Sequence, residues 1–227
     1  MKKLLLIDTS RPVTQLGLCL GDSFSSVRSQ KSRMAAQEVL PLVQQLLMAA
    51  NQDLQDLHGI AVITGPGSFT GLRIGIGVAQ GLGSALNIPL LSISSLALQA
   101  FSAARQTGCV NCLVAEEARV PEVYFAAYKV RADTAYELLG QEQVGTVESL
   151  LIQDFGAPNQ DQSGVGSAWQ NPVLTKSLQE KFSPGSIVDV ESRIDDACML
   201  AKLEFERGAA TESLVLPNYV KEQLDYS

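Results

Sequence analysis

The stretch GIAVITGPGSFTGLRIG, residues 59–75, decides the fold that we expect for this chain. Its first part, Gly59–Thr64, predicts a buried strand, because a short apolar run bounded by turn residues is typical of one. The tripeptide Gly65–Gly67 ends that strand in a turn. Ser68 then opens a helix that we expect to run to about Leu86. The stretch therefore predicts a strand, a glycine-rich turn and a helix in direct succession.

Strands and helices alternate on both sides of this stretch. The first three strands form an antiparallel meander, because turn residues separate their short apolar or alternating runs. We expect strands over residues 3–7, 16–20, 23–30, 59–64 and 89–93, and helices over residues 36–50, 68–86 and 95–104. Pro41 lies inside the first of these helices and is expected to kink it or to mark a new first turn. The pattern predicts an α/β fold with a mixed sheet.

The sequence Gln106-Thr107-Gly108 indicates a boundary between two lobes. We expect a first α/β lobe over residues 1–106 and a smaller second α/β lobe over residues 107–227, and we leave open whether the last segment packs back on the first lobe. In the second lobe we expect strands over residues 110–115 and 120–130, a loop over residues 157–166 and a charged amphipathic helix over residues 194–207.

The composition excludes several classes of protein. Hydrophobic residues make up 46% of the 227 residues, which is too many for a disordered chain. The net charge of −7 argues against binding nucleic acid without a partner. Residues 74–104 carry no charge, but their glycines and the Asn-Ile-Pro break at 87–89 argue against a membrane span. The apolar run after Met1 is too short for a signal peptide, so we expect a cytoplasmic protein.

Acid–base and metal chemistry have few candidate residues. His58 is the single histidine, so we expect neither a two-histidine metal site nor a Ser/His/Asp network. Cys109 and Cys112 form a C-x-x-C motif, but it has no second pair and precedes an expected strand, so we interpret its thiols as buried or chance neighbours. Trp169 is either a stacking platform or a half-buried anchor. We predict no catalytic residue and no metal ligand.

A cluster of charges also surrounds an expected strand turn, at Glu116, Glu117, Arg119 and Glu122. It could be a pair of catalytic carboxylates, but charges at strand ends are usually solvated, and we favour that interpretation.

Glycines recur inside the expected helix after Ser68. Gly71 and Gly75 are four residues apart, as are Gly77 and Gly81. Each interior glycine costs a helix about 1 kcal/mol relative to alanine. Such a cost is tolerated where another backbone approaches the helix closely, and this neighbour could be the sheet, another helix or another protein.

Several segments together resemble a known family. Leu5–Ser10, Gly65–Gly75, Val78–Leu82 and the pattern Ala118-Arg119-x-x-Glu122-Val123-Tyr124 are similar to TsaB, also called YeaZ. The resemblance implies the fold of the acetate-kinase, sugar-kinase, Hsp70 and actin superfamily (ASKHA), with two related α/β lobes of which the second is reduced. It also implies a role in forming threonylcarbamoyladenosine beside the tRNA anticodon, as a non-catalytic subunit.

The resemblance further implies partners and a surface for them. A paralogue, TsaD, holds the metal through a histidine pair. An ATPase, TsaE, completes the complex. The chain is therefore expected to contact tRNA only through these partners. The chain alone is expected to form a homodimer through the helices of its first lobe. The interface residues that we expect are Val39, Val43, Leu46, Phe69, Leu72, Arg73, Gly75, Ile76, Ala79 and Gln80. A Gly75→Leu change is accordingly expected to weaken association.

The sequence departs from the family pattern in three places. It has Met34-Ala35-Ala36 where relatives often carry a histidine, Val120-Pro121 after Arg119, and Tyr219-Val220-Lys221 near the end. These departures bear on any small-molecule contact near Arg119, and not on the fold.

Two enzymatic alternatives remain open. The first is an ATP-binding kinase or phosphatase of the same superfamily, using Asp8 with the Gly65–Gly71 loop, because amide groups at a helix N-terminus bind anions. Its phosphate-binding candidates are Asp8, Thr9, Ser10, Gly65, Gly67 and Ser68, and Gly164–Ser167 is its one candidate for a second phosphate loop. We expect no cofactor, although a nucleotide at a partner interface stays open. The second alternative, a peptidase, needs a nucleophile and a base that the sequence does not supply together.

Overall fold

The computed structural model describes residues 2–131, 135–151, 161–210, 214–218 and 220, and the chain divides into two units. Unit 1 comprises Met1–Ser95 and Arg193–Asn218, and unit 2 comprises Leu96–Ser192 and Tyr219–Ser227. The division differs from the expected boundary at residue 106, because the helix that starts at Ser95 belongs to unit 2 and the helix after Arg193 returns to unit 1.

Unit 1 is built on a five-stranded sheet in the order β3-β2-β1-β4-β5. Its strands are β1 (Lys3–Asp8), β2 (Gln15–Leu20), β3 (Ser23–Arg28), β4 (Gly59–Gly65) and β5 (Leu90–Ser94). The first three pair antiparallel, as the meander predicted, whereas β4 and β5 pair parallel. The sheet is therefore mixed, and the fully buried β4 leads directly into the glycine-rich turn.

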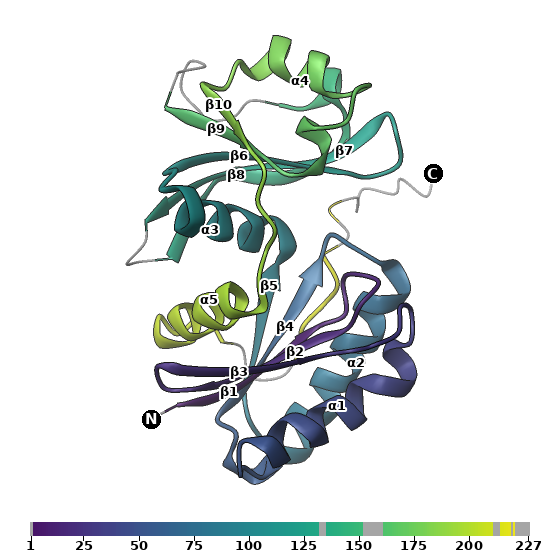
Figure 1. Ribbon diagram of the computed structural model, residues 1–227, viewed down its shortest axis with the longest axis vertical. Coiled ribbons are helices and arrows are strands. Elements are labelled where there is room, and N and C mark those ends of the chain that lie inside the picture. Colours follow the sequence, from purple (N-terminus) through teal and green to yellow (C-terminus); the bar gives the residue numbers. More distant parts are fainter. Residues whose placement is uncertain (1, 132–134, 152–160, 211–213, 219, 221–227) are drawn as a thin grey trace. The chain divides into compact units, whose positions relative to one another are not determined.

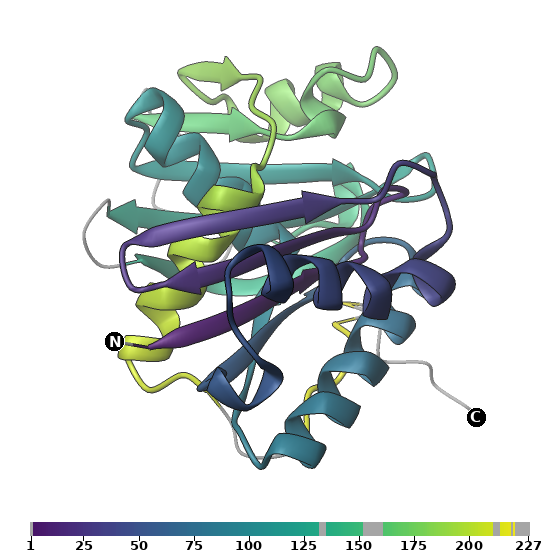
Figure 2. The same cartoon turned by 60° about the horizontal axis from the view of Figure 1, so that its bottom comes forward.

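Helices cover both faces of this sheet (Figure 1). Helices α1 (Ala35–Ala49) and α2 (Phe69–Leu86) lie side by side on one face, where alternate strand residues such as Leu5 and Ile7 join their core. Figure 2 shows the same pair from another side. Helix α5 (Ile194–Glu206) packs on the opposite face, with Cys198 against Gly17 of β2. Pro41 lies within α1, as expected.

Unit 2 repeats the strand order of unit 1. Its sheet runs β10-β9-β6-β7-β8, so that an antiparallel meander is again extended by two parallel strands. The strands are β6 (Asn111–Glu117), β7 (Glu122–Arg131), β8 (Ala135–Thr146), β9 (Gln162–Val165) and β10 (Ser186–Val188). Helices α3 (Ser95–Thr107) and α4 (Thr175–Phe182) flank it. The repeated topology confirms the α/β fold with mixed sheets and two lobes that was expected from the sequence.

Two expectations for unit 2 are corrected. The expected loop over residues 157–166 contains β9, which lies between β10 and β6 and whose Gln162 and Ser163 are buried; residues 157–160 lie outside the described residues. Trp169 is neither a platform nor half-buried, because it is 2% exposed and its indole N–H donates to the Leu113 carbonyl at 2.9 Å. The sequence did not predict β9 because its residues are mostly polar. Gly164 in that strand makes room for the Trp169 ring.

Within the described ranges, no helix is both long enough and apolar enough to cross a membrane.

Candidate functional site

The glycine-rich turn packs closely on the end of β1. The Ser68 N–H donates to the Ser10 carbonyl at 2.7 Å, and a Cβ at Gly67 would lie 2.7 Å from the same oxygen. Ser68 caps α2, because its hydroxyl accepts the Gly71 N–H at 3.3 Å. The turn thus needs glycine at position 67 for close backbone approach, and it uses the Ser68 amide within the chain.

The polar residues at the end of β1 bond to one another. Asp8 is 6% exposed, and its Oδ1 accepts both the backbone N–H and the hydroxyl of Ser10, at 2.9 and 2.6 Å. The Thr9 hydroxyl donates to the Gly71 carbonyl at 2.7 Å. The structure therefore brings all six phosphate-binding candidates together, but in an arrangement in which Asp8 and Ser10 stabilise a turn.

The candidate for a second phosphate loop has a carboxylate beside it. The Glu116 carboxylate accepts the N–H of Ser167 at 3.3 Å and its hydroxyl at 2.6 Å. Gly166 lies against the Ala115 carbonyl, 2.5 Å from the position of an added Cβ. A negatively charged side chain at these donors opposes the binding of a phosphate group. The other charges of this turn, Glu117, Arg119 and Glu122, lie at the ends of β6 and β7.

Gly71 and Gly75 face Thr9, directly after β1, and for Gly75 this corrects the expected assignment to a partner surface. An added Cβ would lie 2.0 Å from the Thr9 carbonyl at Gly71 and 2.2 Å from the Thr9 hydroxyl at Gly75. Both glycines are buried. A Gly75→Leu change would thus disturb the core of unit 1, and its effect on association could not be separated from unfolding.

Most of the other expected interface residues are buried in the same core, so their side chains offer no surface to a partner. These residues are Val39, Val43, Leu46, Leu72, Ile76 and Ala79, each at most 4% exposed. Gln80 is half-buried, and its side-chain amide donates to the Val215 carbonyl at 2.7 Å. Phe69 and Arg73 are the expected residues that remain exposed. The apolar residues whose spacing suggested an interface instead pack α1 and α2 on the sheet of unit 1.

The outward side of α2 is a smooth, almost uncharged helix face. Arg73, Gly77, Gly81 and Ala85 are exposed at four-residue spacing, and an added Cβ at either glycine would meet nothing within 4 Å. Arg73 is the one charged residue of α2, and its guanidinium stacks 3.8 Å from the centre of the Phe69 ring. The Arg73–Ala85 row, with Phe69, is called the α2 face below.

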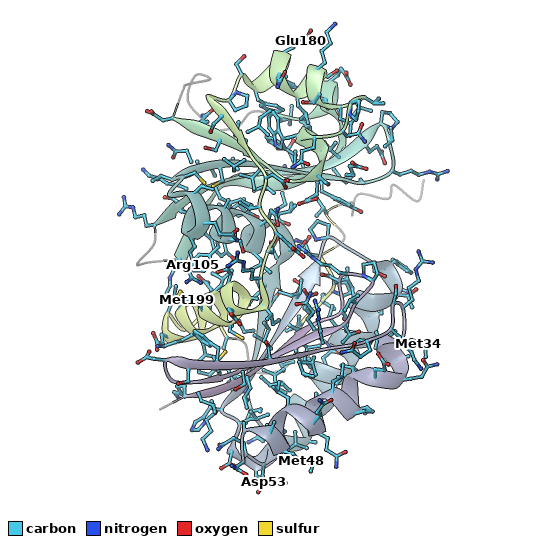
Figure 3. All side chains as sticks on the ribbon, viewed as in Figure 1. Met34, Met48, Asp53, Arg105, Glu180 and Met199 are labelled. Carbon is cyan, nitrogen blue, oxygen red and sulfur yellow. The ribbon has the colours of Figure 1, made fainter. Side chains whose placement is uncertain are left out.

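An apolar groove of about 430 Å³ lies beside the α2 face. Its apolar lining consists of Leu40, Val43, Leu47, Met48, Leu54 and Leu82. Leu40 and Met48 are 53% and 69% exposed although both are large and apolar. Figure 3 shows Met48 and Asp53 at the same end of the structure, where the groove is bordered by the residues after α1. Leu40, Gln44 and Met48 recur every fourth residue along the side of α1 that lines the groove.

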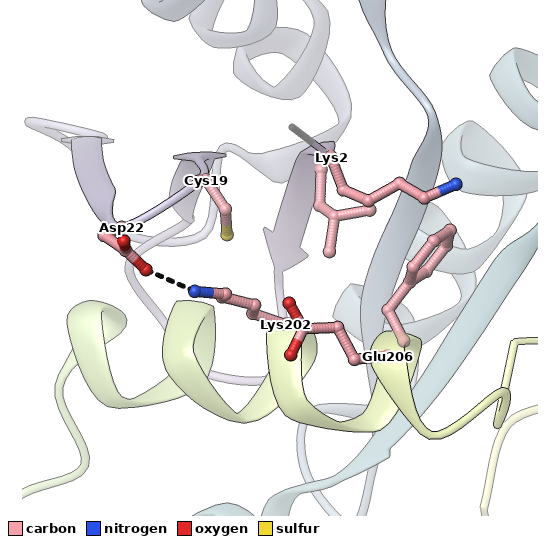
Figure 4. Close-up of a pocket in the computed structure, with 8 residues that line it drawn as sticks. Lys2, Cys19, Asp22, Lys202 and Glu206 are labelled. Atoms are coloured by element: carbon pink, nitrogen blue, oxygen red, sulfur yellow. Dashed lines mark hydrogen bonds and ion pairs between the residues drawn. The ribbon is translucent and has the colours of Figure 1, made fainter.

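A second, smaller pocket lies between the β1–β2 sheet and α5 in unit 1 (Figure 4). Its volume is about 190 Å³. The Lys202 ammonium pairs with Asp22, and the Lys2 ammonium lies 5.6 Å from the centre of the Phe205 ring. The ion pair lowers the pKa of Asp22 through a hydrogen bond from Lys202. We assign no ligand to this pocket.

The remaining candidates for chemistry lie apart. His58 precedes β4 and accepts the Lys3 N–H at 3.3 Å, whereas Ser68 follows the other end of that strand. A seven-residue strand spans roughly 20 Å, so these two side chains cannot form a nucleophile–base pair. The described residues hold no group of three or more His, Cys, Asp or Glu side chains placed to bind a metal ion.

Comparison with known proteins gives concordant matches. The family model "TsaD: tRNA N6-adenosine threonylcarbamoyltransferase" matches residues 26–205. The tRNA threonylcarbamoyladenosine biosynthesis protein TsaB of Escherichia coli (strain K12) is 33% identical over 87% of each chain, and that of Haemophilus influenzae is 31% identical over 98% of this chain and 95% of its own. A Pseudomonas aeruginosa crystal structure, described as similar to peptidase YeaZ, superposes with a TM-score of 0.84 at 32% identity, covering 97% of this chain and 100% of that one.

Proposed function

Because this chain belongs to the TsaB (YeaZ) family of tRNA threonylcarbamoyladenosine biosynthesis proteins, we propose that it is a non-catalytic subunit that activates threonylcarbamoyl transfer by binding a TsaD-type partner. In this proposal a TsaE-type ATPase joins the complex, and tRNA is contacted through the partners.

The α2 face carries this proposal. Interior glycines at positions 77 and 81 each weaken a helix by about 1 kcal/mol, and among the described residues no neighbour uses the space that they leave. A partner helix that packs flush on the face would use it, because small residues allow backbones to approach closely. The face has one charged residue and borders exposed Leu40 and Met48, a composition typical of the centre of a protein interface.

The dimensions fit such an interface. An α-helix of 18 residues is about 27 Å long, and the groove beside α2 widens the contact area. Stable interfaces bury about 800 Å² on each partner, which two adjacent helices can supply. When the chain is alone, a second copy would use the same face, so we propose that homodimer formation and TsaD binding compete.

A non-catalytic role accounts for the polar residues of the turn. The Asp8 carboxylate is held by Ser10, and the Ser68 hydroxyl caps α2, so both groups have structural partners. The single His58 cannot supply the histidine pair of a TsaD-type metal site. The net charge of −7 also favours contact with tRNA through a partner. These observations favour the subunit over the kinase, phosphatase and peptidase alternatives.

Reconstitution tests the proposal. TsaD- and TsaE-type proteins of the same organism, ATP, threonylcarbamoyl-adenylate and unmodified tRNA are combined with and without this chain, and threonylcarbamoyladenosine is measured after nucleoside digestion. We expect product only when the chain is present. Equal product in its absence contradicts the proposal, and so does product formed by this chain without the TsaD-type protein.

A further inference from the structure

Two cysteines of unit 2 lie in contact although no disulfide joins them. The sulfurs of Cys109 and Cys112 are 3.2 Å apart. Cys109 lies between α3 and β6 and is partly exposed, whereas Cys112 is the second residue of β6 and is 1% exposed. The sequence suggested chance or buried thiols, and the structure corrects this by bringing the two sulfurs together with only one of them accessible.

The surroundings give the two sulfurs different roles. A hydrogen bond from the Cys112 thiol, helped by hydroxyl donors from Thr107 and Ser163, lowers the pKa of Cys109 to about 6. The same hydrogen bond raises the pKa of Cys112, and the burial of its thiol raises that pKa further. Its sulfur also lies 3.7 Å from the Ala100 carbonyl of α3. An accessible sulfur that ionises easily beside a buried one that keeps its proton is the arrangement of an attacking and a resolving cysteine.

We propose that Cys109 and Cys112 form a thiol–disulfide exchange site for low-molecular-weight disulfides, with Cys109 as the attacking sulfur and Cys112 as the resolving sulfur. This site lies in unit 2, whereas the α2 face belongs to unit 1, so the proposal does not rest on the proposed partner binding.

The exchange balances in two steps. The Cys109 thiolate attacks one sulfur of a disulfide RSSR, which forms a Cys109–SR mixed disulfide and releases RS⁻. The Cys112 thiol then gives up its proton to a thiolate in solution and attacks the Cys109 sulfur, which releases the second RS⁻. The small disulfide is reduced to two thiols, and the protein pair is oxidised to one disulfide.

The local backbone can accommodate the product. A disulfide needs its sulfurs about 2.05 Å apart, so the pair must approach by roughly 1 Å from its present contact. Gly108 immediately precedes Cys109 at φ +79°, and nothing lies within 4 Å of the position of its missing Cβ. This glycine gives the Cys109 loop room to move toward β6.

The other cysteine pair is an internal control. Cys19 and Cys198 are 1% and 0% exposed, and the Cys19 thiol donates to the Cys198 carbonyl at 3.5 Å (Figure 4 shows the Cys19 sulfur). Both pairs can be followed in the same sample. A reagent that modified all cysteines without selectivity would react with the two pairs at the same rate.

Exchange is tested with glutathione disulfide on the reduced, full-length protein, followed by trapping with N-ethylmaleimide and peptide mass spectrometry. We expect a Cys109–Cys112 disulfide in the wild type, a stable glutathione adduct on Cys109 in Cys112→Ser, and no adduct in the 109–112 segment of Cys109→Ser. The melting temperature of each variant is measured in parallel with its reaction with glutathione disulfide. Reaction of the wild-type pair no faster than that of Cys19 and Cys198 overturns the proposal.

Alkylation by iodoacetamide tests the roles separately, because it needs no disulfide. The rate at Cys109 is expected to rise with pH about a midpoint near 6 in the wild type, since the thiolate is the reacting form. Removing the Cys112 hydrogen bond in Cys112→Ala should move the midpoint upward and slow the reaction roughly tenfold at pH 6.5. Ser163→Ala should move it less. A wild-type midpoint near 8.5, the value of an ordinary thiol, contradicts the assigned roles.

Discussion

Glycines of α2 have two distinct roles that residue type alone does not separate. Gly71 and Gly75 lie against Thr9 of the β1 end, whereas Gly77 and Gly81 point into open space. The four-residue spacing within each pair is identical, so the sequence predicted small faces without showing which one meets the sheet. The structure places the first pair in the packing of unit 1 and leaves the second pair exposed.

The inward role of Gly75 predicts a specific coupling. Gly75→Ala should lower the free energy of unfolding by about 1–3 kcal/mol, because the new Cβ would lie 2.2 Å from the Thr9 hydroxyl. In a Thr9→Ala background the nearest remaining Thr9 atom is Cβ at 3.4 Å, so the same change should cost almost nothing. A double-mutant cycle by urea denaturation measures the coupling. Equal costs in both backgrounds would refute the assignment.

The outward role of Gly77 predicts the opposite sign. Gly77→Ala should raise the free energy of unfolding by up to about 1 kcal/mol, because alanine favours the helix and its methyl meets nothing. Thermal unfolding of the two alanine variants side by side checks this. A Gly77→Ala variant as destabilised as Gly75→Ala would show that position 77 is not open.

At the scale of elements, the start of α2 depends on one side chain. Ser68→Ala removes the oxygen that accepts the Gly71 N–H and should cost about 1 kcal/mol of stability, while Ser68→Asp should retain most of it. Tm measurements compare the two variants. We expect both to support threonylcarbamoyl transfer in the reconstituted complex, and loss of transfer in a folded Ser68→Ala protein would revive a catalytic role for this hydroxyl.

The elements of unit 1 were predictable because their sequence signals are local and strong. The meander, α1 and α2 follow from apolar periodicity and turn residues, and the structure confirms each of them. In contrast, β9 has the sequence Gln-Ser-Gly-Val and is buried through its position between β6 and β10. Its one glycine accommodates Trp169, a tertiary contact that no local pattern contains.

The candidate site was predictable only in part. The turn residues Asp8–Ser10 and Gly65–Ser68 do come together, because the ends of neighbouring strands β1 and β4 meet at one edge of the sheet. Most of the interface residues expected from the sequence are buried, because apolar spacing in an amphipathic helix marks its buried side. The exposed residues are glycines on α2 and Leu40 and Met48 on α1, and their exposure depends on which faces the rest of the chain covers.

At the scale of the whole molecule, the two units share one strand order although their sequences differ. In unit 1 the strands β3, β4 and β5 are joined through the long helices α1 and α2, whereas α4 between β9 and β10 has eight residues. Helix α5 returns to unit 1 from the far end of the chain. An amphipathic pattern cannot show which sheet such a helix covers, and this explains why the sequence left open whether the last segment packs on the first lobe.

The returning segment anchors unit 1 through one side chain, and this predicts a contrast. Val215 is 3% exposed in the core of unit 1, whereas its neighbour Leu216 is 66% exposed. Val215→Ala should lower the free energy of unfolding by about 1–3 kcal/mol, and Leu216→Ala should change it by less than about 0.5 kcal/mol. Chemical denaturation monitors both, and equal effects would contradict the placement of this segment.

The central claim is that a partner lies flush on the α2 face, and calorimetric titration with the TsaD-type protein tests it most directly. Gly77→Ala should bind with the Kd of the wild type, whereas Gly77→Leu should bind at least about tenfold more weakly, because a bulky side chain in a tight contact costs about 1–3 kcal/mol. The Tm of Gly77→Leu should not fall, since its side chain meets open space in the free chain. A folded Gly77→Leu protein that binds with the wild-type Kd would contradict the claim.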